Sequence, residues 1–215
     1  MITVLVVDDH DLVRAGVVSL LSSISGIQVV GEASSGEEAI NIAREKRPNV
    51  VLMDLRMPGI GGLEATHRIL QIDSDIKIII LTSCANEPFP SKLLQAGARG
   101  YLTKGILVDE MVAAIRAVHS GKRYLGPEIA QQLALKTLSD GEETPFDKLS
   151  ERELQVAMMI SSGQTVARIA EKLCVSPKTI NSYRYRIYEK LKLKTNVELT
   201  LLAMRYELLE NEGRF

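Results

Sequence analysis

One apolar run that ends on a single carboxylate constrains this chain more than any other stretch. Residues 50–53 read Val-Val-Leu-Met, and they are followed by Asp54 and then by a Met57-Pro58-Gly59 turn. Such an unbroken run favours a strand buried on both faces of a parallel sheet. The last residue of that strand then lies at the carboxyl edge of the sheet, where open α/β folds bind their ligands. We therefore expect Asp54 to be a metal ligand or a nucleophile.

Strand-like and helical patterns alternate along the first part of the chain. The strand-like runs cover residues 3–7, 28–31, 50–54, 77–82 and 100–103. The helical patterns cover residues 12–23, 37–46, 63–71, 90–96 and 109–120. This alternation predicts a five-stranded parallel α/β sheet with helices on both faces and right-handed crossovers. We assign residues 1–121 to this domain.

The pattern changes after residue 121. Residues 122–145 predict a helix that begins at Pro127 and a polar, turn-rich tether after it. Residues 146–215 show helical periodicity and no strand pattern, and we assign them to an all-α domain of four helices. Ser150 and Glu153 have the spacing of a capping box for the first helix, and Ser176-Pro177 begins the third. The tight turn before Ser176 joins two short helices, which predicts a helix-turn-helix.

Several polar groups fall at the same predicted edge of the sheet. Asp8 and Asp9 follow the first strand, Thr82 ends the fourth, and Lys104 follows the fifth. Three converging carboxylates repel one another, and a hard cation such as Mg²⁺ relieves that repulsion. The hydroxyl and the ammonium suit the oxygens of a phosphoryl group. Together these residues predict phosphoryl transfer to Asp54, with metal and lysine neutralising the charge.

The third helix of the second domain separates an apolar face from a polar, basic one. From residue 145 onward the chain holds 12 Lys and Arg against 9 Asp and Glu, whereas the rest of the chain is acidic. This asymmetry and the polar face indicate contact with nucleic acid, although a charged, solvated face is an equally good interpretation of the helix alone. The candidate DNA-contacting residues are Lys178, Thr179, Asn181, Ser182, Arg184, Tyr185, Arg186, Lys190, Lys192 and Lys194.

Composition narrows the setting. No apolar run approaches the roughly 20 residues of a membrane helix, so we expect no membrane partner. The chain starts in a strand-like pattern without a basic leader. Cys84 and Cys174 stand far apart, which indicates neither a disulfide framework nor a zinc site and fits a reducing compartment. The cytoplasm is the expected location.

Residues 1–121 resemble the receiver domain of two-component response regulators. The likeness rests on Asp8-Asp9 after Val-Leu-Val-Val, Asp54 before Arg56-Met57-Pro58-Gly59, Thr82 after Ile-Ile-Ile-Leu, and Lys104 after Gly-Tyr-Leu-Thr. The resemblance implies a flavodoxin-like, doubly wound sheet of order 2-1-3-4-5 and phosphorylation of Asp54 by a sensor histidine kinase. It also implies Mg²⁺ held by Asp9, Asp54 and the Arg56 carbonyl, with Asp8 reaching it through water. Thr82 and Tyr101 match the family's switch pair, whose ring turns inward when the hydroxyl contacts the phosphoryl group.

Residues 149–191 resemble the LuxR-type helix-turn-helix domain. The likeness rests on Leu149-Ser150-Glu151-Arg152-Glu153, Gly163, Ile169-Ala170, Leu173, Ser176-Pro177-Lys178-Thr179-Ile180 and Leu191. The two halves together resemble the NarL/FixJ class of response regulators, and more narrowly a group of global regulators within it. This resemblance implies a transcription regulator, not an enzyme, that binds double-stranded promoter DNA and forms a homodimer when phosphorylated.

Two positions depart from the family pattern. Gly105 follows Lys104 where many receivers have a proline with a cis peptide bond, so we expect no cis bond there. Residues 86–90 hold two prolines ahead of the fourth predicted helix, which should stiffen that loop. We also expect His10 to be solvated or to cap a helix rather than to tune the acids.

Two other functions compete with this prediction. A phosphatase with an aspartyl-phosphate intermediate would need a second acid two residues after Asp54, where Arg56 stands. Alternatively, a receiver could control a protein- or RNA-binding output. The preferred hypothesis is that phosphorylation of Asp54 releases the helix that starts at Pro177 from the receiver. Leu201, Leu202, Leu208 and Leu209 of the last helix are then the candidate dimer contact, or simply core.

Overall fold

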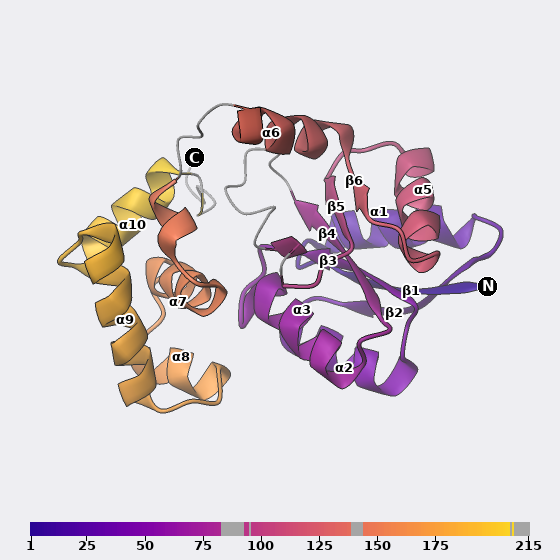
Figure 1. Ribbon diagram of the computed structural model, residues 1–215. Helices are drawn as coiled ribbons and strands as arrows, with labels where there is room; N and C mark the ends of the chain where they lie inside the picture. Colours follow the sequence, from indigo (N-terminus) through magenta and orange to yellow (C-terminus); the bar gives the residue numbers. More distant parts are fainter. Residues whose placement is uncertain (83–92, 95, 139–143, 207, 209–215) are drawn as a thin grey trace. The chain divides into compact units, whose positions relative to one another are not determined.

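The computed structural model describes residues 1–82, 93–94, 96–138, 144–206 and 208 (Figure 1). The described residues up to Leu135 form one compact unit, and those from Lys136 onward form another. No helix among the described residues is long and apolar enough to cross a bilayer. The first unit is built on a sheet and the second on helices.

The first unit is organised by a parallel sheet. Its strands are β1 (Ile2–Val7), β2 (Ile27–Ala33), β3 (Val50–Asp54), β4 (Lys77–Thr82), β5 (Gly100–Thr103) and β6 (Tyr124–Leu125). The strand order is β2-β1-β3-β4-β5-β6, and every neighbouring pair is parallel. β3 is central and wholly buried, as expected from its unbroken apolar run. The five predicted strands and their order are confirmed, with ends that differ by one or two residues.

The prediction of five strands was one short. β6 consists of two residues that continue the sheet beyond β5, where Gly126 donates a hydrogen bond of 2.8 Å to the Tyr101 carbonyl. A strand this short shows no alternation that could separate it from a loop. After β6 the chain forms α6 (Pro127–Leu138), whose Ile129 is fully buried in the core of the sheet unit. Part of the stretch predicted as linker therefore packs with the first unit.

Helices cover both faces of the sheet, and each face has its own core. α2 (Gly36–Lys46), α3 (Gly61–Ile72) and α6 contribute to one core, which also contains Tyr101. α1 (Asp11–Ser22) and α5 (Val108–His119) contribute to the other. Figure 1 shows α2 and α3 on one side of the strands and α1 and α5 on the other. These helices confirm four of the predicted ones, whereas the helix predicted at 90–96 lies largely outside the described residues.

The second unit is a small helical bundle. It consists of a single 3-10 turn, η1 (Pro145–Lys148), and the helices α7 (Glu151–Ser161), α8 (Val166–Lys172), α9 (Pro177–Leu191) and α10 (Asn196–Arg205). Apolar side chains from all five elements meet in one core that includes Phe146, Ile169 and Ile187. No strand occurs among the described residues of this unit. The prediction of four helices is confirmed, and η1 is an addition that the pattern did not show.

Local capping explains where these helices begin. The Glu153 amide donates to Ser150 Oγ and the Ser150 amide donates to Glu153 Oε2, which forms the predicted capping box of α7. Ser176 Oγ accepts from the Thr179 amide at 3.1 Å, and Pro177 occupies the first turn of α9. Between α8 and α9 the chain reverses at Cys174, which has a φ of +53°. The helix-turn-helix geometry of α8 and α9 follows from these caps and this turn.

Candidate functional site

The polar residues predicted for the sheet edge do converge. Asp8 follows β1, Asp54 ends β3, Thr82 ends β4 and Lys104 follows β5, so parallel strands deliver all four to the carboxyl edge. Asp8 and Asp54 are each only 1% exposed. Ligand atoms of Asp8, Asp9, His10 and Asp54 all lie within 4.8 Å of one another. The sheet thus gathers three carboxylates and one imidazole in a single pocket.

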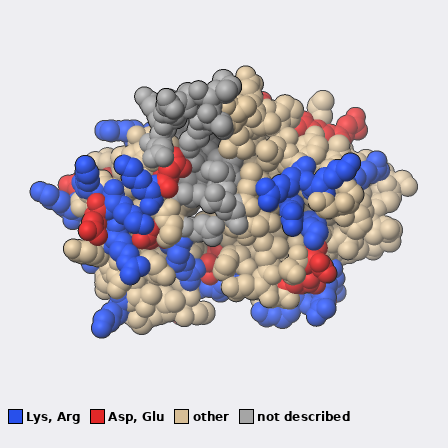
Figure 2. All heavy atoms as spheres, in the orientation of Figure 1, with Lys and Arg blue, Asp and Glu red and all other residues tan. Residues whose placement is uncertain are grey.

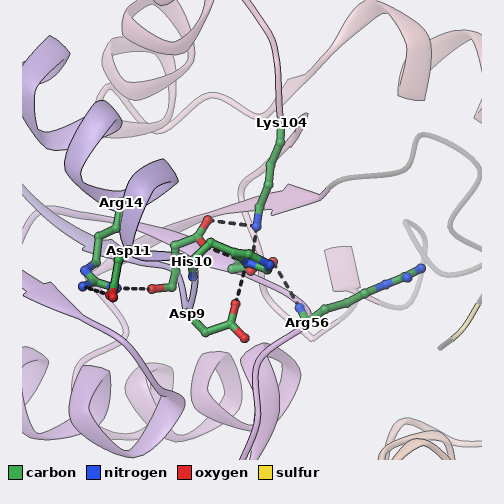
Figure 3. A network of polar contacts seen from close by, with 8 residues as sticks. Asp9, His10, Asp11, Arg14, Arg56 and Lys104 are labelled. Atoms are coloured by element: carbon green, nitrogen blue, oxygen red, sulfur yellow. Dashed lines mark hydrogen bonds and ion pairs between the residues drawn. The ribbon is translucent and has the colours of Figure 1, made fainter. Parts of the chain in front are cut away.

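Lys104 bridges the two buried acids. Its Nζ donates a hydrogen bond of 2.7 Å to Asp54 Oδ2 and lies 2.8 Å from Asp8 Oδ2 (Figure 3). The Lys104 amide also donates to the Thr82 carbonyl at 2.5 Å, which fixes the lysine backbone beside β4. Burial lowers the pKa of the ammonium, but the bond to Asp54 and the charges of Asp54 and Asp8 outweigh burial and raise it. Lys104 is therefore held as a cation in the pocket.

Burial makes Asp54 an unusual carboxyl group. Loss of water raises the pKa of Asp54 from 3.8 to about 6, although Lys104 and the Arg56 amide pull the pKa down. The Arg56 amide donates to Asp54 Oδ1 at 3.1 Å, so each carboxylate oxygen has a donor. Asp54 thus keeps its charge near neutral pH through two directed contacts in a desolvated place.

The loop that carries Asp8 and Asp9 is held by two residues of its own neighbourhood. The His10 amide donates to Asp8 Oδ1 at 2.9 Å, and the His10 ring places Nδ1 2.9 Å from Asp9 Oδ1. Arg14 of α1 donates to the Asp8 carbonyl at 2.8 Å and to the Asp11 carboxylate at 2.6 Å. His10 is half exposed and is the N-cap residue of α1, as expected, but its ring also contacts the acids. Arg14 was not among the predicted site residues.

The donor set of this pocket fits a divalent cation. Asp8 Oδ2 and Asp9 Oδ1 are buried and accept no well-directed hydrogen bond from the described residues, although Lys104 and His10 lie within ion-pair distance. Carboxylate oxygens with free lone pairs are the ligands that hard cations prefer. The pocket is thus an acidic cluster able to hold such an ion.

The residues around the pocket are tightly packed. Thr82 is 1% exposed and the Tyr101 ring is fully buried, so the ring already points inward in this structure. A Cβ at Gly62 would lie 2.1 Å from the Asp54 carbonyl oxygen, so α3 can begin against β3 only with glycine there. No cis peptide bond occurs among the described residues, so the bond between Lys104 and Gly105 is trans. Gly105 has a φ of +104°.

The second candidate surface is the polar face of α9. Ile180, Ile187 and Leu191 are buried against the bundle, as the helical periodicity of this segment predicts. The exposed residues among the candidates are Lys178, Asn181, Ser182, Tyr185, Arg186, Lys190, Lys192 and Lys194, while Thr179 and Arg184 are half-buried. Lys and Arg side chains gather over this part of the bundle (Figure 2). Tyr185 is 71% exposed, so its ring is accessible to a ligand.

Not every candidate on α9 is free for a ligand. Lys190 Nζ lies 2.5 Å from Glu153 Oε2, and the Glu153 side chain is only 4% exposed. Burial raises the pKa of Glu153, but the bonds from Lys190 and Ser150 outweigh it, and the net pKa is lowered. Ser182 Oγ donates to the Lys178 carbonyl and Thr179 Oγ1 pairs with Ser176 Oγ. Lys190 therefore connects α9 to α7, a role that helical periodicity does not reveal.

Comparison with family models covers both units. Residues 4–116 match the model described as "Response regulator receiver domain". Residues 147–203 match the model described as "Bacterial regulatory proteins, luxR family". The first match spans the acidic pocket and the second spans α8 and α9, so both candidate sites lie inside the matched segments.

The similarity to known proteins extends over nearly the whole chain. The chain is 58% identical to "Response regulator GacA" of Pseudomonas protegens over 98% of this chain and 99% of that one. It is 54% identical to "Response regulator UvrY" of Escherichia coli K12 over 99% and 98%. The structure of RcsB from Salmonella enterica serovar Typhimurium, bound to promoter rprA with phosphomimetic BeF3⁻, superposes with a TM-score of 0.73 at 25% identity, covering 94% and 97%. The chain therefore belongs to the two-component response regulators that join a receiver domain to a LuxR-family DNA-binding domain.

Proposed function

We propose that Asp54 accepts a phosphoryl group from a sensor histidine kinase and that this event controls DNA binding by α9. The observation that carries the proposal is the bridge of Lys104 between the buried carboxylates of Asp8 and Asp54, at 2.8 and 2.7 Å. A cation placed there can stabilise added phosphoryl oxygens as well as the carboxylate. Transcription regulation is the function of this family, and the roles of single residues are our inference.

Each residue of the pocket has a defined part in this proposal. Asp54 is the nucleophile, and Lys104 shifts its contact from Asp54 to the phosphoryl oxygens. Thr82 supplies a hydroxyl to the same oxygens, and Tyr101 fills the space behind it. Asp8, Asp9, Asp54 and the Arg56 carbonyl would hold Mg²⁺, which supplies charge neutralisation at the phosphoryl group. This transfer, and the hydrolysis of the aspartyl phosphate that releases inorganic phosphate, are the chemistry that we assign to the chain.

On the DNA side, α9 is proposed to enter the major groove. Asn181, Ser182 and Tyr185 face away from the bundle and are placed to contact base edges. Lys178, Arg184, Arg186, Lys192 and Lys194 would contact phosphates, which contributes affinity and register. Thr179 and Lys190 remain weaker candidates because the α9 cap and Glu153 occupy their polar atoms. Such a regulator would act on promoters in the cytoplasm.

We further propose that the phosphorylated protein binds DNA as a homodimer through α10. Leu201 is 60% exposed and Val197 is 68% exposed, one helical turn apart, which forms an uncovered apolar stripe. Leu208, which was also considered as a contact, is 4% exposed and belongs to the core of the bundle. Leu209 lies outside the described residues. The exposed apolar stripe of α10 thus contains fewer leucines than the four that were considered as contacts.

Labelling with acetyl phosphate tests the central proposal. Asp54→Asn should abolish incorporation in the presence of Mg²⁺, because the amide cannot attack phosphorus. Asp11→Asn is the matched control, since the Asp11 side chain is 89% exposed beside the pocket, and it should retain labelling. Label that persists at wild-type level in Asp54→Asn would place the acceptor elsewhere.

A further inference from the structure

His10 adds a nitrogen to a pocket otherwise made of oxygen ligands. Its Nδ1 lies 2.9 Å from Asp9 Oδ1 and 3.4 Å from Asp8 Oδ1, and its side chain is 51% exposed (Figure 3). The His10 amide donates to Asp8 Oδ1, so the backbone of His10 is hydrogen-bonded to the acid cluster. The imidazole is therefore held beside the acids by its position in the loop.

The pocket also contains acceptor atoms that no described donor satisfies well. Asp8 is 1% exposed, and its Oδ2 accepts no directed hydrogen bond although Lys104 is near. Asp9 Oδ1, which lies 2.9 Å from His10 Nδ1, also accepts no directed hydrogen bond from the described residues. One ligand atom from each of the four side chains Asp8, Asp9, His10 and Asp54 lies within 4.8 Å of the other three, a separation that one ion at ordinary ligand distances can span.

We propose that His10 is a further ligand of the cation in this pocket. With His10 as a ligand, the preference of the site for borderline first-row cations such as Co²⁺ and Ni²⁺ over Mg²⁺ would be larger than with oxygen ligands alone. Imidazole is a strong ligand for these ions, whereas Mg²⁺ prefers oxygen and water. This inference rests on the proposed acidic metal site and adds a ligand and a selectivity to it.

Calorimetric titration of the untagged full chain with Mg²⁺ and with Ni²⁺ tests the proposal. His10→Ala should raise the Ni²⁺ Kd at the pocket by about tenfold or more and change the Mg²⁺ Kd by less than about threefold. His119→Ala is the matched control, because His119 is exposed at the end of α5 and should account for none of the tight site. Electron spin echo of bound Mn²⁺ should show a directly coordinated ¹⁴N that His10→Ala removes.

The outcomes separate this inference from the proposed function. Unchanged Ni²⁺ affinity in His10→Ala, or an equal loss for Ni²⁺ and Mg²⁺, would overturn the role of His10 as a ligand. Asp54→Asn should weaken both ions in either case. If wild type bound Ni²⁺ through His10 but failed to bind Mg²⁺ at millimolar concentration, the magnesium site of the proposed function would fail while His10 stood. Circular dichroism of each variant confirms that the fold is kept.

Discussion

Burial and a single lysine act in opposite directions on the Asp54 carboxylate. The 1% exposure of Asp54 favours its neutral form, whereas Lys104 at 2.7 Å favours the charge that a nucleophile needs. Because these effects leave the pKa of Asp54 at about 6, the carboxyl group gains or loses its proton close to the pH of a cell. A positive charge added beside Asp54, such as a bound cation, should therefore lower its pKa and favour the charged form.

Titration of Asp54 follows directly from that balance. In the metal-free protein the carboxyl ¹³C resonance of Asp54 should shift with a midpoint near 6, and Mg²⁺ should move the midpoint down. Because the folded state binds this proton more tightly than the unfolded chain, Asp54 reduces the free energy of unfolding as pH rises from about 4 to about 6. Measurement by NMR on the metal-free chain decides the point. A midpoint at the ordinary value of 3.8 would contradict the desolvation described for Asp54.

Gly62 offers a second test at this scale. Alanine there places Cβ 2.1 Å from the Asp54 carbonyl oxygen and 2.9 Å from Leu55 Cα, so β3 and α3 must separate. We expect Gly62→Ala to lower the free energy of unfolding by about 2–4 kcal/mol and to slow phosphorylation. Gly16→Ala in α1 meets nothing within 4 Å and should instead stabilise by about 0.5–1 kcal/mol. Urea denaturation of both variants provides the comparison, and equal effects would refute the packing argument.

The positions of single residues were predictable where the backbone alone determines them. Asp8, Asp54, Thr82 and Lys104 could be placed together because each follows or ends a strand of one parallel sheet. The contacts of His10 with Asp9 and of Lys190 with Glu153 depend on side-chain rotamers and on packing between elements. Such contacts leave no periodic signal, so the sequence predicted a solvated or capping role for His10 and a DNA contact for Lys190.

At the scale of elements, length decides what the pattern reveals. β3 and α9 are strongly patterned, and both ends of β3 and the first residue of α9 agree with the expected ones. β6 has two residues and η1 has four, too few for a hydrophobic period, and tertiary contacts such as the burial of Ile129 and Phe146 stabilise their surroundings. The helix around residues 90–96 remains a prediction.

The ion pair between Lys190 of α9 and Glu153 of α7 should stabilise the contact between these two helices. Lys190→Gln leaves the buried Glu153 carboxylate without its cation, so the free energy of unfolding should fall by about 1–3 kcal/mol at pH 7. The pKa of Glu153 is lowered by folding, so this stabilisation is present above the ordinary glutamate pKa of 4.5 and is lost as pH falls through the folded value. Denaturation of wild type and variant at pH 7 and pH 3 should show the difference shrinking.

Lys192 is the matched control for Lys190. It is exposed just after α9, in a left-handed conformation with a φ of +56°. Lys192→Gln should leave stability within about 0.5 kcal/mol but reduce the salt dependence of DNA binding by about one unit of slope. If Lys190→Gln changed DNA affinity and left stability untouched, the structural role assigned to Lys190 would be wrong.

At the scale of the whole molecule, the proposed function requires two sites on separate units to influence each other. The pocket belongs to the unit that ends at Leu135, and α9 belongs to the other. Linkage demands that such an influence be reciprocal: whatever phosphorylation does to DNA affinity, DNA must do to the phosphorylated state by the same factor. Sequence predicted both sites but contains no pattern for this coupling, because coupling is a difference in free energy between two arrangements of the chain.

Reciprocity is measurable with beryllofluoride, a reversible mimic of the phosphoryl group. We expect BeF₃⁻ with Mg²⁺ to tighten promoter binding by the full chain about 5- to 150-fold, the usual range of allosteric coupling. Saturating promoter DNA should then tighten BeF₃⁻ binding at Asp54 by the same factor, measured by calorimetry at one salt concentration. Asp54→Asn should abolish both effects and keep basal DNA binding, since α9 and its basic residues are intact. If BeF₃⁻ bound the wild-type pocket without altering DNA affinity, Asp54 would still be a phosphoacceptor, but the control of α9 by Asp54 would be excluded.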